Sequence, residues 1–368
     1  MSAPLDESLL DDETRLAEAD RSGMLRAVAT AGAQVRESLA LAAEAELTAA
    51  LAGVRPRAVL VAVDPDADDV AEAVSALSDR PDSVAPVVRQ DGPALPVWAG
   101  PVDVLLTASA SPIATAPPSL VEAAARHGLT VVGTSPADSL LHEACGRNRA
   151  AFVPLPAGRH PRANLWAPLV PLLLAAGELG LMPATGVDLR GCADLLDTVA
   201  ERCRPGSETY GNPAKLLALD LAESLPVVIG STPAGGAVAR RLAGNLASAG
   251  RLAVWGTLPV APSRLAGLLA APVGVTVDHD LFRDRVDEDT PARPRLVLVR
   301  AGEEADHVRG QVDELVAGCG RSGVPVTEVM AEDAVGPIGR LASVLALLDF
   351  TAAYVGIASG SSDQEDYG

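Results

Sequence analysis

Short apolar runs alternate with helix-forming segments along most of the chain, and this alternation restricts the fold more than any other feature. Each run is rich in valine and leucine and carries no polar face, which is typical of a strand buried on both sides. Segments between the runs repeat leucine, alanine and valine at helical spacing. The pattern predicts parallel sheets with helices on both faces. The runs are RAVLVAV (57–63), VDVLLTA (102–108), LTVVGT (129–134), AAFVPL (150–155), LPVVIGS (225–231), RLAVWG (251–256), RLVLVR (295–300) and VPVTEVM (324–330).

The same order of strands and helices occurs in both halves of the sequence, which predicts two similar α/β domains. The 368 residues are enough for two domains of ordinary size. With 48% hydrophobic but only 2% aromatic residues, the core must be packed mainly from leucine, valine and alanine. We expect an N-terminal helical segment over 1–50, a first domain over 51–185, a second over 186–357 and an exposed tail over 358–368.

Net charge limits the kinds of molecule that the protein could bind, and cysteine content indicates the cellular compartment in which it folds. The chain carries 48 acidic and 29 basic residues, a formal net charge of −19, so nucleic acid and anionic membrane surfaces would repel it. Its four cysteines are scattered and form no C-x-x-C pair, which indicates a reduced, cytoplasmic protein. The acidic N-terminus has neither the basic nor the apolar region of a signal peptide.

One apolar segment, LASVLALLDFTAAYVGIASG (341–360), is long enough to span a membrane but contains Asp349. A carboxylate near the middle of a span costs about 2.5–3.5 kcal/mol on insertion scales. We therefore expect a buried core helix or a dimer-interface helix and no membrane partner.

The turn GSTPAGG (230–236) follows an apolar run and precedes a helix, so it is a candidate anion loop. Ser231 and Thr232 would add hydroxyl donors, and Gly235 would let the backbone approach a ligand. An ordinary strand-to-helix turn is the alternative. Gly236 and Ala237 stand where a Walker loop has lysine and serine or threonine, and no G-x-G-x-x-G is present. The sequence therefore predicts no nucleotide cofactor.

The corresponding turn of the first half, TASASPIATAPPSL (107–120), carries a dense set of hydroxyls. Hydroxyls at the end of a strand suit the oxygens of a sugar phosphate. A proline-broken loop with solvated hydroxyls explains them equally well. The candidate phosphate-binding residues are Thr107, Ser109, Ser111 and Thr115.

Few other residues suggest chemistry. Arg159 and Arg162 precede a long apolar helix and are either surface cations or ligand contacts. The five histidines lack metal-ligand spacing, so no metal site is predicted, and no G-x-S-x-G elbow supports a hydrolase. His279 lies among acidic residues, which is typical of a solvated loop.

Five stretches of the sequence are distinctive when taken together: DRSGMLRAV (20–28), PRANL (161–165), GNPAKLLALDLAESLPVVIGS (211–231), RLVLVR (295–300) and LLDFTAAYVGIASG (347–360). In their order and spacing they resemble the bifunctional phosphoglucose/phosphomannose isomerases, which are built from two sugar isomerase (SIS) domains. The resemblance implies a flavodoxin-like three-layer αβα sandwich in each half, a homodimer, and no metal or cofactor. It implies aldose–ketose isomerisation, an intramolecular oxidoreduction, of glucose, fructose or mannose 6-phosphate. It places the phosphate loop at Thr107–Thr115 and the transition-state cation at Arg162, and leaves His279 as a candidate for ring opening.

The sequence also departs from that family where the chemistry would be. The family has a glutamate and a nearby histidine after a second-domain strand, whereas residues 251–278 contain neither. Thr257, Val260 and Ser263 stand roughly in their place. The first glycine-rich loop of the family is replaced by DPDADD (64–69), whose carboxylates would repel a phosphate dianion.

Three hypotheses remain open from the sequence. The chain is a phosphosugar isomerase with a rearranged or weakened acid–base pair, a non-catalytic phosphosugar-binding or regulatory protein, or a dimeric structural partner without a small ligand.

Overall fold

The computed structural model describes residues 5–222, 224–260, 265, 267, 269, 293–331, 334 and 336–360. The chain divides into two compact units, each of which contains one parallel sheet. The first-sheet unit comprises Arg26–Glu201 and Glu332–Ala346, and the second-sheet unit comprises Met1–Leu25, Arg202–Ala331 and Leu347–Gly368. The domain limits at residues 50, 185 and 357 stay a prediction, and 361–368 of the predicted tail lie outside the described residues.

The sheet of the first-sheet unit has the strand order β2-β1-β3-β4-β5, and every neighbouring pair is parallel. Its register sets Leu60 beside Leu105 and Leu105 beside Val131, so large apolar side chains form a row across one face. The strands are β1 (Val59–Val63), β2 (Val87–Arg89), β3 (Val104–Ala108), β4 (Thr130–Ser135) and β5 (Ala151–Pro154).

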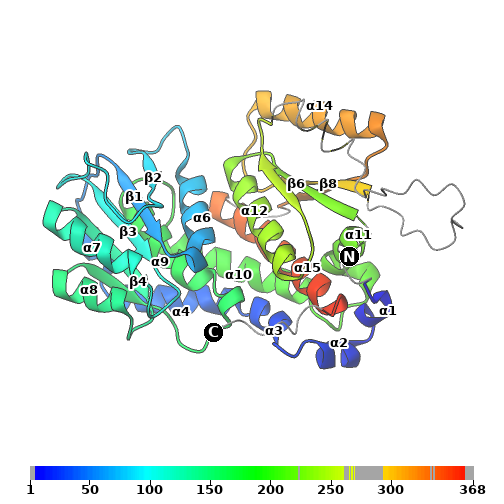
Figure 1. The fold of residues 1–368 in the computed structure, drawn as a ribbon, viewed down its shortest axis with the longest axis horizontal. Coiled ribbons are helices and arrows are strands. Elements are labelled where there is room, and N and C mark those ends of the chain that lie inside the picture. The colour runs from blue at the N-terminus through cyan, green and yellow to red at the C-terminus, as the bar shows by residue number, and fades with distance from the viewer. Residues whose placement is uncertain are drawn as a thin grey trace, which may run out of the picture. The chain divides into compact units, whose positions relative to one another are not determined.

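Helices cover both faces of this sheet (Figure 1). That apolar row packs against α7 (Ala116–His127) and α8 (Leu140–Asn148). On the other face lie α6 (Asp68–Ser78) and α9 (Trp166–Glu178), and α9 is buried along nearly its whole length because it is apolar all round. The unit also contains η1 (Pro65–Ala67), η2 (Pro161–Ala163), α4 (Ala31–Glu44), α5 (Leu47–Leu51), α10 (Gly186–Arg202) and most of α3 (Met24–Ala29).

The sheet of the second-sheet unit has the order β7-β6-β8-β9, again parallel throughout. Val227 and Ile229 point to the face covered by α14, whereas α12 packs on the other (Figure 1). The strands are β6 (Ser224–Gly230), β7 (Val254–Thr257), β8 (Arg293–Arg300) and β9 (Val326–Met330). The helices are α1 (Glu7–Leu10), α2 (Glu13–Ala19), η3 (Thr209–Gly211), α11 (Pro213–Ala222), α12 (Pro233–Ser248), α14 (Asp306–Ser322) and part of α15 (Gly336–Ala358).

Helix α15 is the segment with membrane-like length and composition. In its most apolar 18-residue window, 89% of the residues are buried inside the structure. Its Asp349 accepts hydrogen bonds from Arg241 of α12, at 2.8 and 3.0 Å, and from Asn245 at 2.9 Å. A buried carboxylate is tolerated when it is paired and hydrogen-bonded, so these contacts explain how a charge lies within this apolar helix.

A buried lysine attaches the N-terminal segment to the second-sheet unit. The Nζ atom of Lys215 donates to the carbonyl oxygens of Leu10 (2.5 Å), Pro205 (2.7 Å) and Ser207 (2.8 Å). Those three acceptors match the three protons of the ammonium group. The amide of Asp6 also donates to the carbonyl of Ala358 at 2.9 Å, so two separate contacts hold this segment.

Candidate functional site

The first candidate site lies at the carboxyl ends of β1 and β3. The strand order reverses between these neighbours, and open α/β sheets bind ligands at such a point. Asp64 follows β1 and is 3% exposed, and Ser109 follows β3 and is fully buried. The Ser109 hydroxyl donates to Asp64 Oδ2 at 2.5 Å, and the Ser111 amide donates to the same oxygen at 3.2 Å. The loop that the sequence assigns to a phosphate thus holds a carboxylate of the chain itself.

Asp64 also caps the short helix η1. Its Oδ1 accepts a hydrogen bond from the Ala67 amide at 2.9 Å, which satisfies a donor at the helix start. Both carboxylate oxygens are therefore engaged, each by neutral donors. Asp66, in the same loop, is exposed.

The other two hydroxyls predicted for this site lie elsewhere. Thr107 points to the same face of β3 as Leu105, beneath α7 and α8, where its Oγ1 is buried without a hydrogen-bond partner. Thr115 is exposed at the start of α7, and its carbonyl accepts the Ser119 hydroxyl at 2.9 Å. The structure therefore brings together Ser109 and Ser111 but not the full predicted set of four.

The predicted cations lie beyond strand β5. Arg162 is half-buried in η2, and β4 separates β5 from β3 in the sheet. Arg159 forms an ion pair with Glu37 of α4. Through this ion pair, Arg159 connects its loop to α4. The ligand roles of both arginines stay predictions.

The second candidate loop joins β6 to α12. Thr232 caps α12, since its Oγ1 accepts the Gly235 amide at 3.2 Å and its carbonyl accepts the Gly236 amide at 2.8 Å. Pro233, the first helical residue, has no amide hydrogen. Positions 233, 235 and 236 therefore offer no free backbone N–H to an anion. Glycine is required here because a Cβ on Gly230 would lie 2.1 Å from the Gly236 nitrogen.

A carboxylate lies at this loop as well. Glu304, in the loop after β8, has a side chain only 6% exposed. The nearby Ser231 hydroxyl donates to the Val299 carbonyl at 3.4 Å. Arg300 binds the Glu304 carboxylate with two donors, at 2.8 and 2.6 Å. Burial alone would raise the pKa of Glu304, but the hydrogen bonds from Arg300 hold it below its ordinary value.

The end of β7 is the place where the resemblance sets a proton-transfer pair. Thr257 ends that strand, and its Oγ1 would be 1.9 Å from a Cβ on Gly236, so it packs against the first turn of α12. His279 and Ser263 lie outside the described residues. Within the described part of the chain, no group of three or more histidine, cysteine, aspartate or glutamate residues could hold a metal ion.

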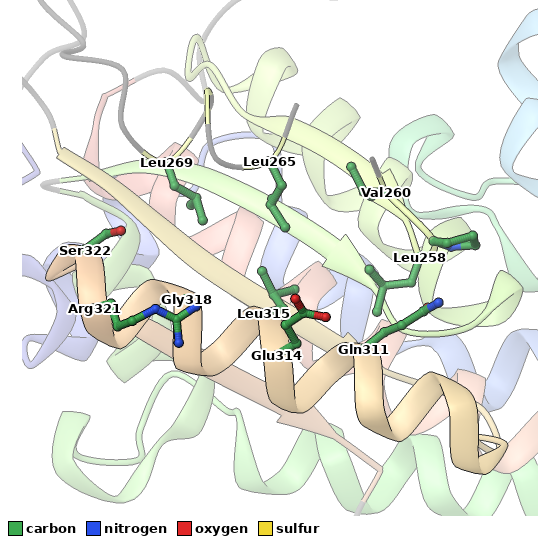
Figure 2. Close-up of a pocket in the computed structure, with 11 residues that line it drawn as sticks. Leu258, Val260, Leu265, Leu269, Gln311, Glu314, Leu315, Gly318, Arg321 and Ser322 are labelled. Atoms are coloured by element: carbon green, nitrogen blue, oxygen red, sulfur yellow. The ribbon is translucent and has the colours of Figure 1, made fainter. Parts of the chain in front are cut away.

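A pocket of about 550 Å³ lies between α14 and the chain that follows β7 (Figure 2). Leu258, Val260 and Leu265 face Leu315 of α14 across it, so its lining is mostly apolar. Glu314 and Arg321 stand at its α14 side. The pocket lacks a concentration of hydrogen-bond donors and does not resemble a phosphate site.

The sequence did not point to Glu304, and for Asp64 it indicated repulsion of a phosphate but not the hydrogen bonds to Ser109 and Ser111. The signal for Asp64 was its place directly after one buried strand, while Ser109 directly follows another. For Glu304, the equivalent signal was the GEE sequence soon after β8. To place either carboxylate beside a serine, one must know the order of strands in the sheets, which composition and spacing do not provide.

Residues 211–363 match the family described as the bacterial phospho-glucose isomerase C-terminal SIS domain. A bifunctional phosphoglucose/phosphomannose isomerase of Caldicellulosiruptor bescii is 30% identical over 94 residues, which are 26% of this chain and 28% of that protein.

Solved structures share the fold along most of the chain. Tagatose-6-phosphate ketose/aldose isomerase of Escherichia coli matches with a TM-score of 0.61 and 13% identity, covering 96% of this chain and 95% of that one. The C-terminal domain of glucosamine-fructose-6-phosphate aminotransferase from Francisella tularensis matches with a TM-score of 0.57 and 10% identity, covering 92% and 96%. These similarities confirm the predicted α/β fold with parallel sheets.

Proposed function

We propose that this chain, whose residues 211–363 match the bacterial phospho-glucose isomerase C-terminal SIS domain, binds a sugar phosphate and isomerises it slowly or not at all. The candidate ligands are glucose, fructose and mannose 6-phosphate, in keeping with the name of the Caldicellulosiruptor bescii relative. A cytoplasmic homodimer is part of the same proposal. Arg162 would stabilise developing negative charge, and Ser109 and Ser111 would meet the phosphoryl group.

The observation that carries the loss of activity is the end of β7. Aldose–ketose isomerisation moves a proton between C1 and C2 and requires a base, usually a carboxylate. Thr257 is found there, packed against Gly236, and its hydroxyl does not accept a proton at neutral pH. Each missing proton-transfer group costs on the order of 10²–10⁴ in rate. The absence of both glutamate and histidine from residues 251–278 supports a very slow reaction.

A protein without a small ligand is the second candidate. The bonding of Ser109 and Ser111 to Asp64 favours it, because these donors are already satisfied. A sugar phosphate would have to displace the Asp64 carboxylate to use them.

Thermal unfolding and a coupled isomerase assay separate these functions. We expect millimolar fructose 6-phosphate to raise the Tm while the coupled assay shows little or no turnover. A ligand at a hundredfold excess over its Kd adds about 2.7 kcal/mol of stability. An unchanged Tm would favour the protein without a small ligand. Rapid turnover that Arg162→Ala abolishes would instead establish an active isomerase and refute the loss of chemistry.

A further inference from the structure

We infer that Asp64 is an internal occupant of the anion position at the ends of β1 and β3, and that this loop admits a phosphoryl group only after the Asp64 carboxylate leaves or is replaced. The ligand class rests on the proposed function, but the occupancy rests on the contacts of Asp64 alone. Asp64 would then set the affinity and selectivity of the site.

The contacts of Asp64 are those that a phosphate oxygen would make. At the point where the strand order reverses, its Oδ2 accepts the Ser109 hydroxyl at 2.5 Å and the Ser111 amide at 3.2 Å. Hydroxyl and amide donors at strand ends are the groups that bind phosphate in such folds. Two anions sharing these donors at hydrogen-bonding distance would repel each other strongly, so a dianion and the Asp64 carboxylate exclude each other.

The second sheet repeats the arrangement with different residues. Its strand order reverses between β6 and β8, Ser231 follows β6, and the buried Glu304 carboxylate lies in the loop after β8, paired with Arg300. In the first sheet the carboxylate follows β1 and the serine follows β3, whereas in the second the serine comes first and the carboxylate later. Each sheet thus has a buried carboxylate in a loop at the point where its strand order reverses, and the two carboxylates follow different strands of their pairs.

The two carboxylates differ in how firmly they are held. Arg300 neutralises Glu304 with a bidentate contact, and such charge-assisted pairs are strong. Asp64 accepts hydrogen bonds from the neutral donors Ala67, Ser109 and Ser111. Asp64 is therefore the carboxylate that an incoming anion would displace.

Substitution of Asp64 tests this inference directly. Asp64→Ser keeps an oxygen that can cap the Ala67 amide while it removes the carboxylate. Asp64→Asn keeps the volume and the cap but removes the charge. Asp66→Ser makes the same change of charge at an exposed position of the same loop and is the matched control. Calorimetric titration of each variant and of the wild-type chain uses inorganic phosphate and, separately, fructose 6-phosphate.

We expect Asp64→Ser to bind inorganic phosphate at least tenfold more tightly than wild type, Asp64→Asn to gain less, and Asp66→Ser to match wild type. Equal phosphate affinity in wild type and Asp64→Ser, or an equal gain in Asp66→Ser, would overturn the inference. If Asp64→Ser does not fold, the phosphate affinity of Asp64→Asn decides: a gain supports the inference and no gain refutes it.

The two probes keep this inference apart from the proposed function. A gain in phosphate binding by Asp64→Ser, with no fructose 6-phosphate binding to wild type, would support the role of Asp64 and refute the sugar phosphate ligand. If wild type binds fructose 6-phosphate and Asp64→Ser binds neither probe more tightly, the sugar phosphate ligand is supported and the role of Asp64 is refuted.

Discussion

Replacing Asp349 by leucine should destabilise the second-sheet unit strongly. The side chains of Arg241 and Asp349 are only 9% and 12% exposed, so their ion pair is shielded from water. Asp349→Leu removes two hydrogen bonds from Arg241 and one from Asn245 and leaves the buried guanidinium without this counter-charge. Removing one partner of a buried pair costs about 3–5 kcal/mol, and we expect a loss of that size.

The double variant provides the sharper comparison. Arg241→Met with Asp349→Leu replaces both charges by apolar side chains, and such exchanges are often neutral or stabilising by about 1–4 kcal/mol. We therefore expect the double variant to be more stable than Asp349→Leu alone. Asp194→Leu is the control, because its ion pair with Arg36 is exposed and should contribute at most about 1 kcal/mol.

Urea unfolding followed by circular dichroism measures the three variants against wild type. The slope m should be similar in all of them if the unfolded surface is unchanged. A loss below about 1 kcal/mol for Asp349→Leu, or a double variant as unstable as the single one, would refute the assigned role of the pair.

Two further predictions concern the second-sheet unit. Gly230→Ala places a Cβ 2.1 Å from the backbone nitrogen of Gly236 and should cost at least about 3 kcal/mol of stability. Gly244→Ala, in open space on α12, should instead stabilise by about 0.5–1 kcal/mol. Similar Tm values for the two variants would contradict this prediction. Glu304→Gln should lower Tm at pH 7 but not in strong acid: the lowered pKa of Glu304 gives stability that is present above its ordinary value of 4.5 and is lost as pH falls through the folded value. A deficit that persists unchanged at pH 3 would show that the carboxylate charge does not contribute.

The sequence predicted most of the architecture because strand and helix periodicities are local. Each of the eight apolar runs overlaps a strand, and the long segment with Asp349 is a buried helix. The missed strand, β2, has only three half-buried residues and pairs with β1 alone. Its sequence PVVRQ is too short for a periodic signal.

The candidate site was less predictable, because it depends on strands that are distant in sequence. Thr107, Ser109 and Ser111 follow one another closely, yet the alternation of a strand sends Thr107 beneath α7 while the turn directs Ser109 to Asp64. Repulsion of a phosphate by the aspartates was foreseen from charge alone. The hydrogen bonds of Asp64 to the serine loop required β1 and β3 to be neighbours, which only the sheet order reveals.

Lys215 has a practical consequence for cutting the molecule into pieces. A fragment that starts at residue 186 would contain the whole second sheet but would lack the Leu10 carbonyl, one of the three acceptors of this buried ammonium. It would also lose the backbone contact between Asp6 and Ala358 at the end of α15. The N-terminal residues thus stabilise a sheet whose strands lie some two hundred positions later in the chain. A stable excised fragment should therefore include these residues, for example through a linker that joins residue 25 to residue 202.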